Sequence, residues 1–522
     1  MISSSSPPLL STQNQRQQPH ALLCSLPAQG HVAPFLNLAR LLASKGIAVT
    51  YLSAEHCISP LRGDHSLLTN PLIHLVGLPE RVPLREAGSD QVYDDLSWLF
   101  DVGDNMKDDF VKFVQFQDTA ADQVKHPNYG AADCMIGDAC LSWITHVASD
   151  LSIPLYTLYT SPTWSLTPLF YVPILTAQGE LPLRSSEQRR LMSLPGLPPL
   201  WDTDLFHVMR DVIPTGVRRA VLNCSLVLSQ SSRILLNTTY EMESDYIDAL
   251  QKEDPCKMNI KIQAIGPLLP SELLETKDDA QYSLRSKHES SVVKQCIEWL
   301  NTQSPASVLY VSFGSLYITS ENEIIEIAHG LEASTHAFLW VLRPPPSNNS
   351  QNASSWISRV LPQGFQSRTR NRGFIFPHWA PQQLILSNPS IGFFLTHCGW
   401  NSILESVCCG VPLIAYPQFG DQNINCRMIV DQLNIGIELE KNEFKGFSER
   451  MAVERAVRTV MEREEGHQIR RKVAQLRDRV GMAVKEEYGS SYRNVEAIVQ
   501  EIYHCFDRKL NKKNTCFPWK SK

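Results

Sequence analysis

Short apolar runs alternate with amphipathic stretches along the chain, a pattern typical of a parallel α/β sheet. Residues 21–26 are apolar, residues 33–44 carry apolar side chains at helical spacing, and residues 47–52 are apolar again. A strand, a helix and a strand in this order predict a doubly wound sheet with helices on both faces. Further strands of the first half are predicted at 72–76, 133–138, 233–238 and 260–265.

The same alternation begins again near residue 292, after a segment, 267–291, that is rich in Pro and charged residues. Its predicted strands are 308–312, 338–342, 391–395 and 411–415. At 522 residues the chain is too long for one ordinary domain. We therefore predict two Rossmann-like α/β domains, 19–266 and 292–487, joined by a linker at 267–291.

The two ends of the chain lack the alternating pattern. Residues 1–18 are polar and rich in Ser, Gln and Pro, which predicts a disordered tail, and the apolar run after them is too short for a signal sequence. A helix predicted at 488–506 is expected to pack back towards the first domain, and 507–522 is a basic tail with no assigned role. No apolar stretch approaches the length of a membrane span.

Composition narrows the classes of function. A formal net charge of −6 and a pI near 6.2 give no basic face for nucleic acid. The 13 cysteines show no paired zinc spacing, so we expect reduced thiols and a cytoplasmic location. Four Asn-x-Ser/Thr matches, interpreted as chance, begin at Asn223, Asn237, Asn348 and Asn352.

Residues 379–422 carry aromatic and polar side chains in the order that a nucleotide with an attached sugar would need. Trp379 can stack on a base, and the amide of Gln382 can reach a sugar hydroxyl or a base edge. The strand 391–395 leads through a small-residue turn into a helix, whose first amides and dipole favour an anion such as a diphosphate. His397 is one of several side-chain donors at that turn.

The other donors at the turn are Asn401 and Ser402. One helical turn later, Glu405 can accept from the two hydroxyls of a ribose, and Asp421 and Gln422 end the stretch with groups suited to a hexose. Each residue also has a purely structural interpretation: Trp379 as core, His397 as a cap, Glu405 as a solvated charge. Their joint order favours a ligand site.

His31 and Asp138 both follow predicted strands of the first domain. Residues just past the carboxyl ends of parallel strands can meet at one sheet edge, where ligands bind in such folds. A carboxylate beside a histidine fixes its tautomer and stabilises the imidazolium, which suits a general base. The structural alternatives are a capping or core histidine, and an aspartate that caps the helix predicted to open at Ala139.

The segment 155–201 is rich in aromatic residues and Pro. Trp164 and Phe170 are candidates for the wall of an apolar acceptor pocket. Ordinary packing under long loops explains the same composition equally well.

The stretch 379–422, 44 residues long, resembles the signature box of the plant secondary-product glycosyltransferases, which are family 1 UDP-glycosyltransferases. That resemblance implies a GT-B fold, in which two Rossmann-like domains face each other across a cleft. It also implies that the His of a P-x-x-G-H turn, here His31, is the base and Asp138 its partner, with Gln29 beside the acceptor. The implied donor contacts are Ser315, Trp379, Ala380, Gln382, His397, Gly399, Trp400, Asn401, Ser402, Glu405, Asp421 and Gln422.

The implied reaction is an inverting transfer of glucose from UDP-glucose to a hydroxyl of a small lipophilic acceptor. Trp400, Asp421 and Gln422 match members that use UDP-glucose, although another UDP-sugar stays open. A flavonoid or other phenol is expected as acceptor, with terpenoids and hormones as alternatives. We expect no metal, no bound cofactor and a monomer; a non-catalytic sugar-nucleotide sensor is the alternative of another class.

Overall fold

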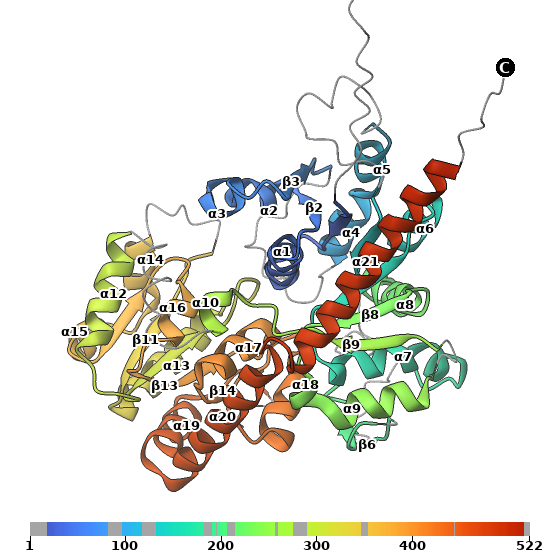
Figure 1. Cartoon of the computed structure of the whole chain (residues 1–522). Coiled ribbons are helices and arrows are strands. Elements are labelled where there is room, and N and C mark those ends of the chain that lie inside the picture. Colours follow the sequence, from blue (N-terminus) through green and yellow to red (C-terminus); the bar gives the residue numbers. More distant parts are fainter. Residues whose placement is uncertain are drawn as a thin grey trace, which may run out of the picture.

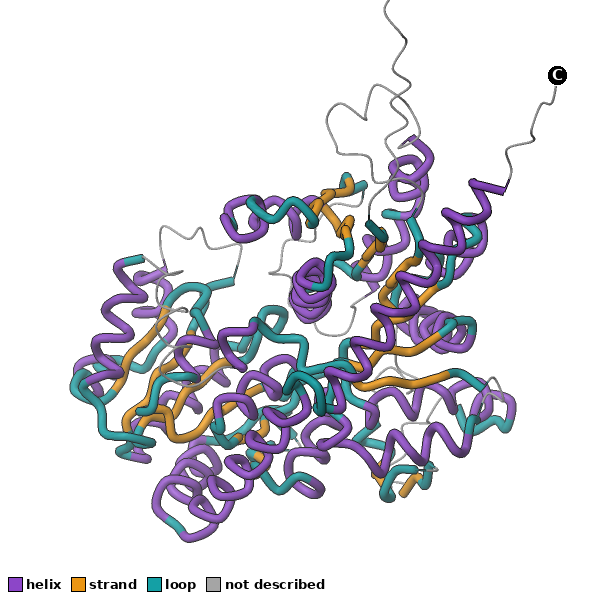
Figure 2. Tube along the Cα trace, viewed as in Figure 1, coloured by secondary structure: helices purple, strands orange, loops and turns teal. Residues whose placement is uncertain are grey.

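Two α/β domains make up the computed structural model (Figure 1). The structure describes residues 18–81, 97–116, 132–181, 191–194, 196–205, 215–255, 259–274, 290–345, 353–442 and 444–515. Each domain is built on a parallel sheet with helices on its faces (Figures 1 and 2), which confirms the predicted fold class.

In the described part of the N-terminal domain, seven parallel strands lie in the order β3-β2-β1-β4-β5-β8-β9. Every residue of β1, β2, β4 and β5 is buried, as expected of strands that are covered by helices on both faces. The strands are β1 (His20–Cys24), β2 (Ala48–Ala54), β3 (Ile73–Leu78), β4 (Cys134–Asp138), β5 (Leu155–Tyr159), β8 (Arg233–Leu236) and β9 (Lys261–Ala264), with a separate pair β6 (Leu191–Met192) and β7 (Leu200–Trp201).

The first helix begins earlier than predicted. We expected 33–44, but α1 runs over Gln29–Ser44, because Ala28 is extended (φ −129°, ψ 142°) and its carbonyl already accepts from the His31 N–H at 2.8 Å. His31 therefore lies in the first helical turn. The other N-terminal helices are α2 (Glu55–Ile58), η1 (Ser59–Gly63), α3 (His65–Leu68), α4 (Ser97–Asn105), α5 (Lys107–Phe116), α6 (Ile144–Asp150), α7 (Thr163–Ala177), α8 (Thr215–Ser229) and α9 (Tyr240–Glu253).

The C-terminal domain repeats the architecture with six parallel strands in its described part, in the order β12-β11-β10-β13-β14-β15. The strands are β10 (Val308–Ser312), β11 (Ala337–Val341), β12 (Gly373–Phe376), β13 (Ile391–Thr396), β14 (Leu413–Ala415) and β15 (Gly436–Glu438). The helices are α12 (Ser291–Asn301), α13 (Glu321–Ser334), α14 (Ala353–Val360), α15 (Phe365–Thr369), α16 (Gln382–Leu386), α17 (Trp400–Cys409), α18 (Gln422–Arg427), the π-helix η4 (Met428–Gln432), α19 (Arg450–Glu462) and α20 (Glu464–Ala483).

Two segments connect the domains. The segment predicted as a linker contains a short helix, α10 (Ser271–Leu274), and residues 275–289 lie outside the described part. The last helix, α21 (Ser490–Thr515), leaves the C-terminal domain and runs along the N-terminal one (Figure 1, red). Its apolar side chains join an N-terminal core cluster: Val495, Ile498, Val499 and Ile502.

The predicted tail 507–522 begins too early, because α21 continues to Thr515. The Lys509 ammonium donates to the carbonyl of Ala132 and lies 3.7 Å from a carboxylate oxygen of Asp133. Lysine residues can thus continue a helix, because the charged ends of their side chains reach a neighbouring domain. Residues 1–17, predicted as a tail, lie outside the described residues.

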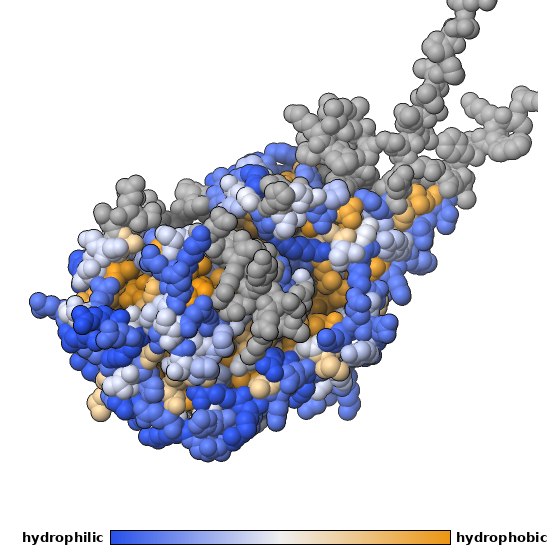
Figure 3. Space-filling model, turned by 60° about the vertical axis from the view of Figure 1, so that its left-hand side comes forward, coloured by the Kyte–Doolittle hydropathy of each residue, from blue (hydrophilic) through white to orange (hydrophobic). Residues whose placement is uncertain are grey.

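Hydrophilic residues cover most of the face seen in Figure 3, and hydrophobic ones show between them in patches. Within the described ranges, none of the helices combines the length and the hydropathy needed to cross a bilayer.

Candidate active site

The structure brings His31 and Asp138 together at the carboxyl edge of the N-terminal sheet. The His31 Nδ1 atom lies 2.8 Å from Asp138 Oδ2, although the two residues are 107 positions apart. Strands β1 and β4 are hydrogen-bonded neighbours, so the residues that follow one and end the other meet at the same edge. Asp138 is buried, and 24% of the His31 side chain is exposed.

Backbone amides hold the Asp138 carboxylate in place. It accepts from the N–H of Leu26 at 3.1 Å and from the N–H of Cys140 at 3.0 Å, while its Oδ2 faces the imidazole. The alternative role as a helix cap is not observed, because the next helix begins only at Ile144. With Nδ1 bound to Asp138, the Nε2 atom of His31 is the nitrogen positioned to exchange a proton with a ligand.

The pair also changes the proton affinity of the ring. Burial lowers the pKa of His31, but the negative charge of Asp138 and the hydrogen bond to it outweigh burial and raise the pKa from 6.5 to about 9. The imidazolium is therefore the stable form at neutral pH. A group that accepts a proton needs this kind of stabilisation once the proton has been transferred to it.

A cysteine completes a three-residue cluster beside the pair. One ligating atom from each of His31, Asp138 and Cys140 lies within 4.8 Å of the others, a grouping that could in principle hold a metal ion. A hydrogen bond to Cys224 and burial both raise the pKa of the Cys140 thiol well above its usual range. The thiol is thus protonated at neutral pH, which disfavours metal binding.

Across from this pair, β13 leads into α17 through the turn 397–399. The imidazole of His397 lies between two glycines: a Cβ built on Gly314 or on Gly399 would come within 2.4 Å of its Nε2. Gly314 also has φ of +76°, a conformation that other residues rarely adopt. The ring can occupy this position only because neither glycine has a side chain.

His397 is neutral at physiological pH. Burial and the positive charge of Arg343 lower its pKa to about 4. A neutral imidazole donates a hydrogen bond without adding charge, and the buried Nδ1 of His397 has no hydrogen-bond partner among the residues that the structure describes. The open N-terminus of α17 beside it suits an anion such as a diphosphate.

Arg343, just after β11, was missed by the sequence analysis. Its guanidinium donates to the carbonyl of Gly314 and lies 5.3 Å from the ring centroid of Trp379. Arg343 therefore brings a positive charge to the site predicted to bind the nucleotide base and the phosphates of the donor. Nothing near Arg343 in the sequence indicates this role, because the contact joins three separate loops.

Trp379 is 59% exposed, which is high for so large an aromatic and leaves its face open to a base. The side chains behind it form a network: the Gln382 amide donates to Ser402 Oγ at 2.9 Å and to Glu405 at 2.7 Å. Burial raises the pKa of Glu405. Ala380, next to Trp379, is buried.

At the end of the predicted sugar site, Gln422 is buried and its carbonyl oxygen accepts from the N–H groups of Gln418 and Phe419, at 2.9 and 3.0 Å. Its amide Nε2 is therefore the end left to donate to a hydroxyl. Burial raises the pKa of Asp421, and the charge of this carboxyl in turn raises that of His31. Asp421 therefore lies close enough to His31 for their charges to interact.

Not every predicted residue lies at the cleft. Gln29 and Ser315 are exposed, beside His31 and after β10 respectively. Trp164 is fully buried and packs edge-on against Tyr246, and Phe170 is 4% exposed in the same core cluster. The prediction that these two line an open acceptor pocket is wrong, because aromatic content does not reveal which side of α7 faces the core.

One hydrogen bond joins the two domains between the two sites. The Asn401 amide, at the start of α17, donates to the carbonyl of Gly30 at 2.9 Å. The donor-side helix thus contacts the residue next to His31.

Comparison with known proteins agrees with this geometry. A family model described as "UDP-glucoronosyl and UDP-glucosyl transferase" matches residues 269–473. UDP-glycosyltransferase 85A7 of Arabidopsis thaliana is 30% identical over 501 residues, which cover 93% of this chain and 97% of the relative. The chain belongs to the plant family 1 UDP-glycosyltransferases.

This member of the family is also 30% identical over 495 residues to the 7-deoxyloganetin glucosyltransferase of Gardenia jasminoides, covering 92% of this chain and 97% of that one. A solved structure of Phytolacca americana UGT2, complexed with UDP-2fluoro-glucose and pterostilbene, matches with a TM-score of 0.74 and 27% identity over 93% of this chain and 100% of that chain. This UDP-glycosyltransferase is accordingly an enzyme that uses a UDP-sugar and a small-molecule acceptor.

Proposed function

We propose that the enzyme transfers glucose from UDP-glucose to a hydroxyl group of a small lipophilic acceptor, with His31 as the general base. The observation that carries this proposal is the 2.8 Å contact between His31 and the buried Asp138. His31 is also the residue next to Gly30, whose carbonyl accepts from Asn401. Asp138 fixes the tautomer, so His31 Nε2 faces the acceptor hydroxyl and takes its proton as the oxygen attacks.

The departing diphosphate is stabilised at the start of α17. The unpaired first amides of the helix point towards it, and His397 and Ser402 add hydrogen-bond donors around the same point. Arg343 supplies a positive charge close enough to His397 to lower its pKa. Preorganised donors of this kind do the work that a divalent cation does in other transferases, so we propose that no metal is required.

The acceptor oxygen attacks the anomeric carbon from the side of the N-terminal domain, while the bond to the diphosphate breaks on the opposite face, towards the C-terminal domain. A single displacement with that geometry inverts the configuration, so an α-linked donor gives a β-linked product. For the acceptor we favour a phenol, because a phenolic hydroxyl gives up its proton to a histidine base more readily than an aliphatic alcohol does. A terpenoid alcohol is the second candidate, favoured by the relatives named for 7-deoxyloganetin. The monomeric state and the cytoplasmic location stay predictions.

The decisive experiment measures UDP release from UDP-glucose in the presence of single acceptors: flavonoids, simple phenols, terpenols, 7-deoxyloganetin and plant hormones. We expect release that depends on the acceptor and a glucoside of matching mass, without added metal and in the presence of a chelator. His31→Ala should lower the transfer rate by at least about 10³-fold and leave UDP affinity within threefold, since the base does not touch UDP.

The other possible outcomes would contradict the proposed function or the role of His31. Release of UDP without any acceptor would indicate hydrolysis, and tight UDP-glucose binding with no turnover would indicate a sensor. Equal loss of transfer and of UDP affinity in His31→Ala would remove His31 from the role of base.

A further inference from the structure

Asn237 lies directly after β8, at the edge of the N-terminal sheet that faces the cleft, and it is completely buried. The Asn237–Thr238–Thr239 triplet matched an acceptor pattern for glycosylation that a buried side chain cannot serve. The buried amide instead contacts the linker and the start of α17, both far away in the sequence.

The side-chain contacts of Asn237 define its orientation. Its Oδ1 accepts from the backbone N–H of Leu268, in the linker, at 2.7 Å, so its Nδ2 must point the other way. That Nδ2 donates to Asn401 Oδ1 at 3.3 Å. Asn401 is oriented in turn, because its own Nδ2 donates to the carbonyl of Gly30. Both amides are thus fixed by backbone groups at their outer ends.

The main chain of Asn237 adds a second bond to the same helix. Trp400, the first residue of α17, donates from its indole Nε1 to the Asn237 carbonyl at 2.6 Å. Gly266, the residue before the linker, passes so close that a Cβ on it would lie 2.8 Å from Asn237 Oδ1. One residue therefore connects the N-terminal sheet, the linker and the donor-side helix.

Pro34 explains why the carbonyl of Gly30 is available to accept from Asn401. In a regular α-helix the carbonyl of Gly30 would accept from the N–H four residues later. Residue 34 is a proline inside α1 and has no N–H to donate. The Gly30 carbonyl is left free within its own helix and accepts instead from Asn401, across the domain boundary.

We propose that Asn237 is a positioning residue for the transfer reaction: it sets the distance and angle between the start of α17 and the turn that carries His31. The inference rests on the proposed function of this site. Asn237 touches neither of the predicted substrates; it acts through Trp400 and Asn401. Small errors in the placement of reacting groups lower rates strongly, since a shift of about 1 Å can cost about 10²-fold.

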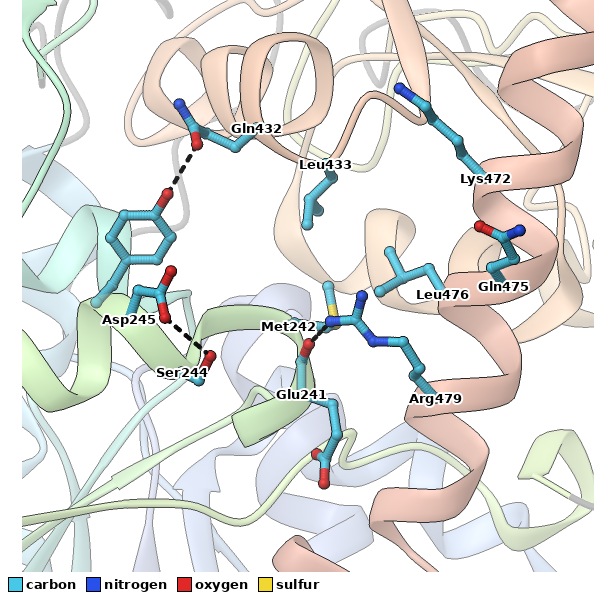
Figure 4. A pocket seen from close by; sticks show the side chains of 11 residues that line it. Glu241, Met242, Ser244, Asp245, Gln432, Leu433, Lys472, Gln475, Leu476 and Arg479 are labelled. Atoms are coloured by element: carbon cyan, nitrogen blue, oxygen red, sulfur yellow. Dashed lines mark hydrogen bonds between the residues drawn. The ribbon is translucent and has the colours of Figure 1, made fainter.

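The domains also meet away from the cleft, and those contacts provide a comparison. A cavity of about 300 Å³ is lined by residues of α9, η4 and α20 and by Leu433. Figure 4 shows the side chains around it. There the Tyr246 hydroxyl donates to Gln432 at 2.8 Å, from one domain to the other. This bond joins the same two domains without reaching α17 or α1.

Asn237→Asp is the informative variant because it is isosteric and keeps the acceptor for the Leu268 N–H. It replaces the donor with an oxygen that faces Asn401 Oδ1, so the Asn401 amide must turn and release Gly30. We expect kcat for acceptor-dependent transfer to fall between 10-fold and 100-fold. The affinity for UDP, measured by calorimetry, should stay within threefold, since UDP is held by the C-terminal domain.

Asn388→Asp is the matched control. Asn388 is also buried, its Oδ1 accepts from the N–H of Ser390, and its Nδ2 donates to another asparagine, Asn301, at 2.9 Å. All three residues lie in the C-terminal domain. Asn388→Asp should lower the melting temperature by an amount comparable to Asn237→Asp, with kcat within threefold of the wild type. Tyr246→Phe, which removes the bond beside the cavity, should also leave kcat within threefold.

The inference fails if Asn237→Asp retains kcat within threefold, or if kcat and UDP affinity fall by the same factor, which would mean that α17 itself is disrupted. It also fails if Asn388→Asp loses as much turnover as Asn237→Asp. A variant that does not fold is replaced by the pair Asn237→Ser and Asn388→Ser, judged in the same way. A wild-type enzyme with no transfer on any acceptor would instead refute the proposed function.

Discussion

Single residues in this enzyme are tuned by their surroundings in opposite directions. His31 and His397 are both histidines at the cleft, yet the pKa of the first is raised and that of the second lowered. The difference lies in the neighbouring charge, which is a carboxylate for His31 and a guanidinium for His397. One ring is therefore suited to gain a proton during the reaction, and the other to remain neutral beside the diphosphate.

The pKa of His31 leads to a prediction about pH. Only the unprotonated ring can act as a base, so with a pKa of about 9 the value of kcat/KM should fall about tenfold for each pH unit below that point. Asp138→Asn removes the charge that raises this pKa, and burial then moves the inflection below 6.5. Initial rates of UDP release between pH 5.5 and 10 test both profiles.

The plateau rate of Asp138→Asn should also be lower by orders of magnitude, because the tautomer is no longer fixed. An inflection that stays in place in Asp138→Asn would show that another group governs the profile. A full rate in that variant would contradict the role of Asp138.

At the scale of elements, the turns after β10 and β13 act as one unit. Each supplies a glycine against the ring of His397, so the shape of both turns is set by one side chain. This contact exists only in the folded state, so the sequence does not show that both glycines pack against the same ring.

Gly314→Ala should weaken the donor site. The added methyl group would lie 2.4 Å from His397 Nε2 and push the ring out of its place, so we expect UDP affinity to fall at least tenfold by calorimetry. The positive φ of this position adds a stability cost of about 1–2 kcal/mol. Gly446→Ala is the control: it has the same kind of backbone conformation, φ +72°, with open space around it.

That control should lose stability, measured by thermal denaturation, but keep its affinity for UDP. Equal effects of the two substitutions on UDP binding would mean that strain, and not the contact with His397, is responsible.

At the scale of the whole molecule, the two domains are held by contacts of different kinds. The cleft side uses buried amides around Asn237, the cavity side uses the bond between Tyr246 and Gln432, and α21 spans from one domain to the other. Arg233 of β8 and Glu501 of α21 form an ion pair beside the apolar contacts of that helix. The N-terminal core is thus completed by the last segment of the chain.

Ile502→Ala tests this dependence. Ile502 is fully buried in the N-terminal core cluster, so its truncation should lower the free energy of unfolding by about 2–5 kcal/mol. His504→Ala, on the exposed side of the same helix, should change it by less than about 0.5 kcal/mol. Denaturant unfolding of both variants gives the comparison, and equal midpoints would show that α21 does not stabilise the N-terminal domain.

The sequence was sufficient to predict the fold, because the fold depends on the local alternation of strands and helices. The donor contacts assigned to residues 379–422 stay a prediction. Asn237 and Arg343 were missed, since their partners lie in loops that only the folded chain brings together. The position of Trp164 was predicted wrongly, because amino-acid composition does not show which way a side chain points. The start of α1 was misplaced because Ala28 offers no side-chain cap that would mark the beginning of the helix in the sequence.

The return of α21 to the N-terminal domain has a consequence for building hybrids of this enzyme with its relatives. A crossover placed in the linker, which would seem to exchange the acceptor half as a unit, leaves Val495 and Ile498 of one parent against a groove evolved in the other. A successful chimera would therefore take residues 490–515 from the same parent as the first half, so that the exchanged piece is discontinuous in the gene but whole in the protein.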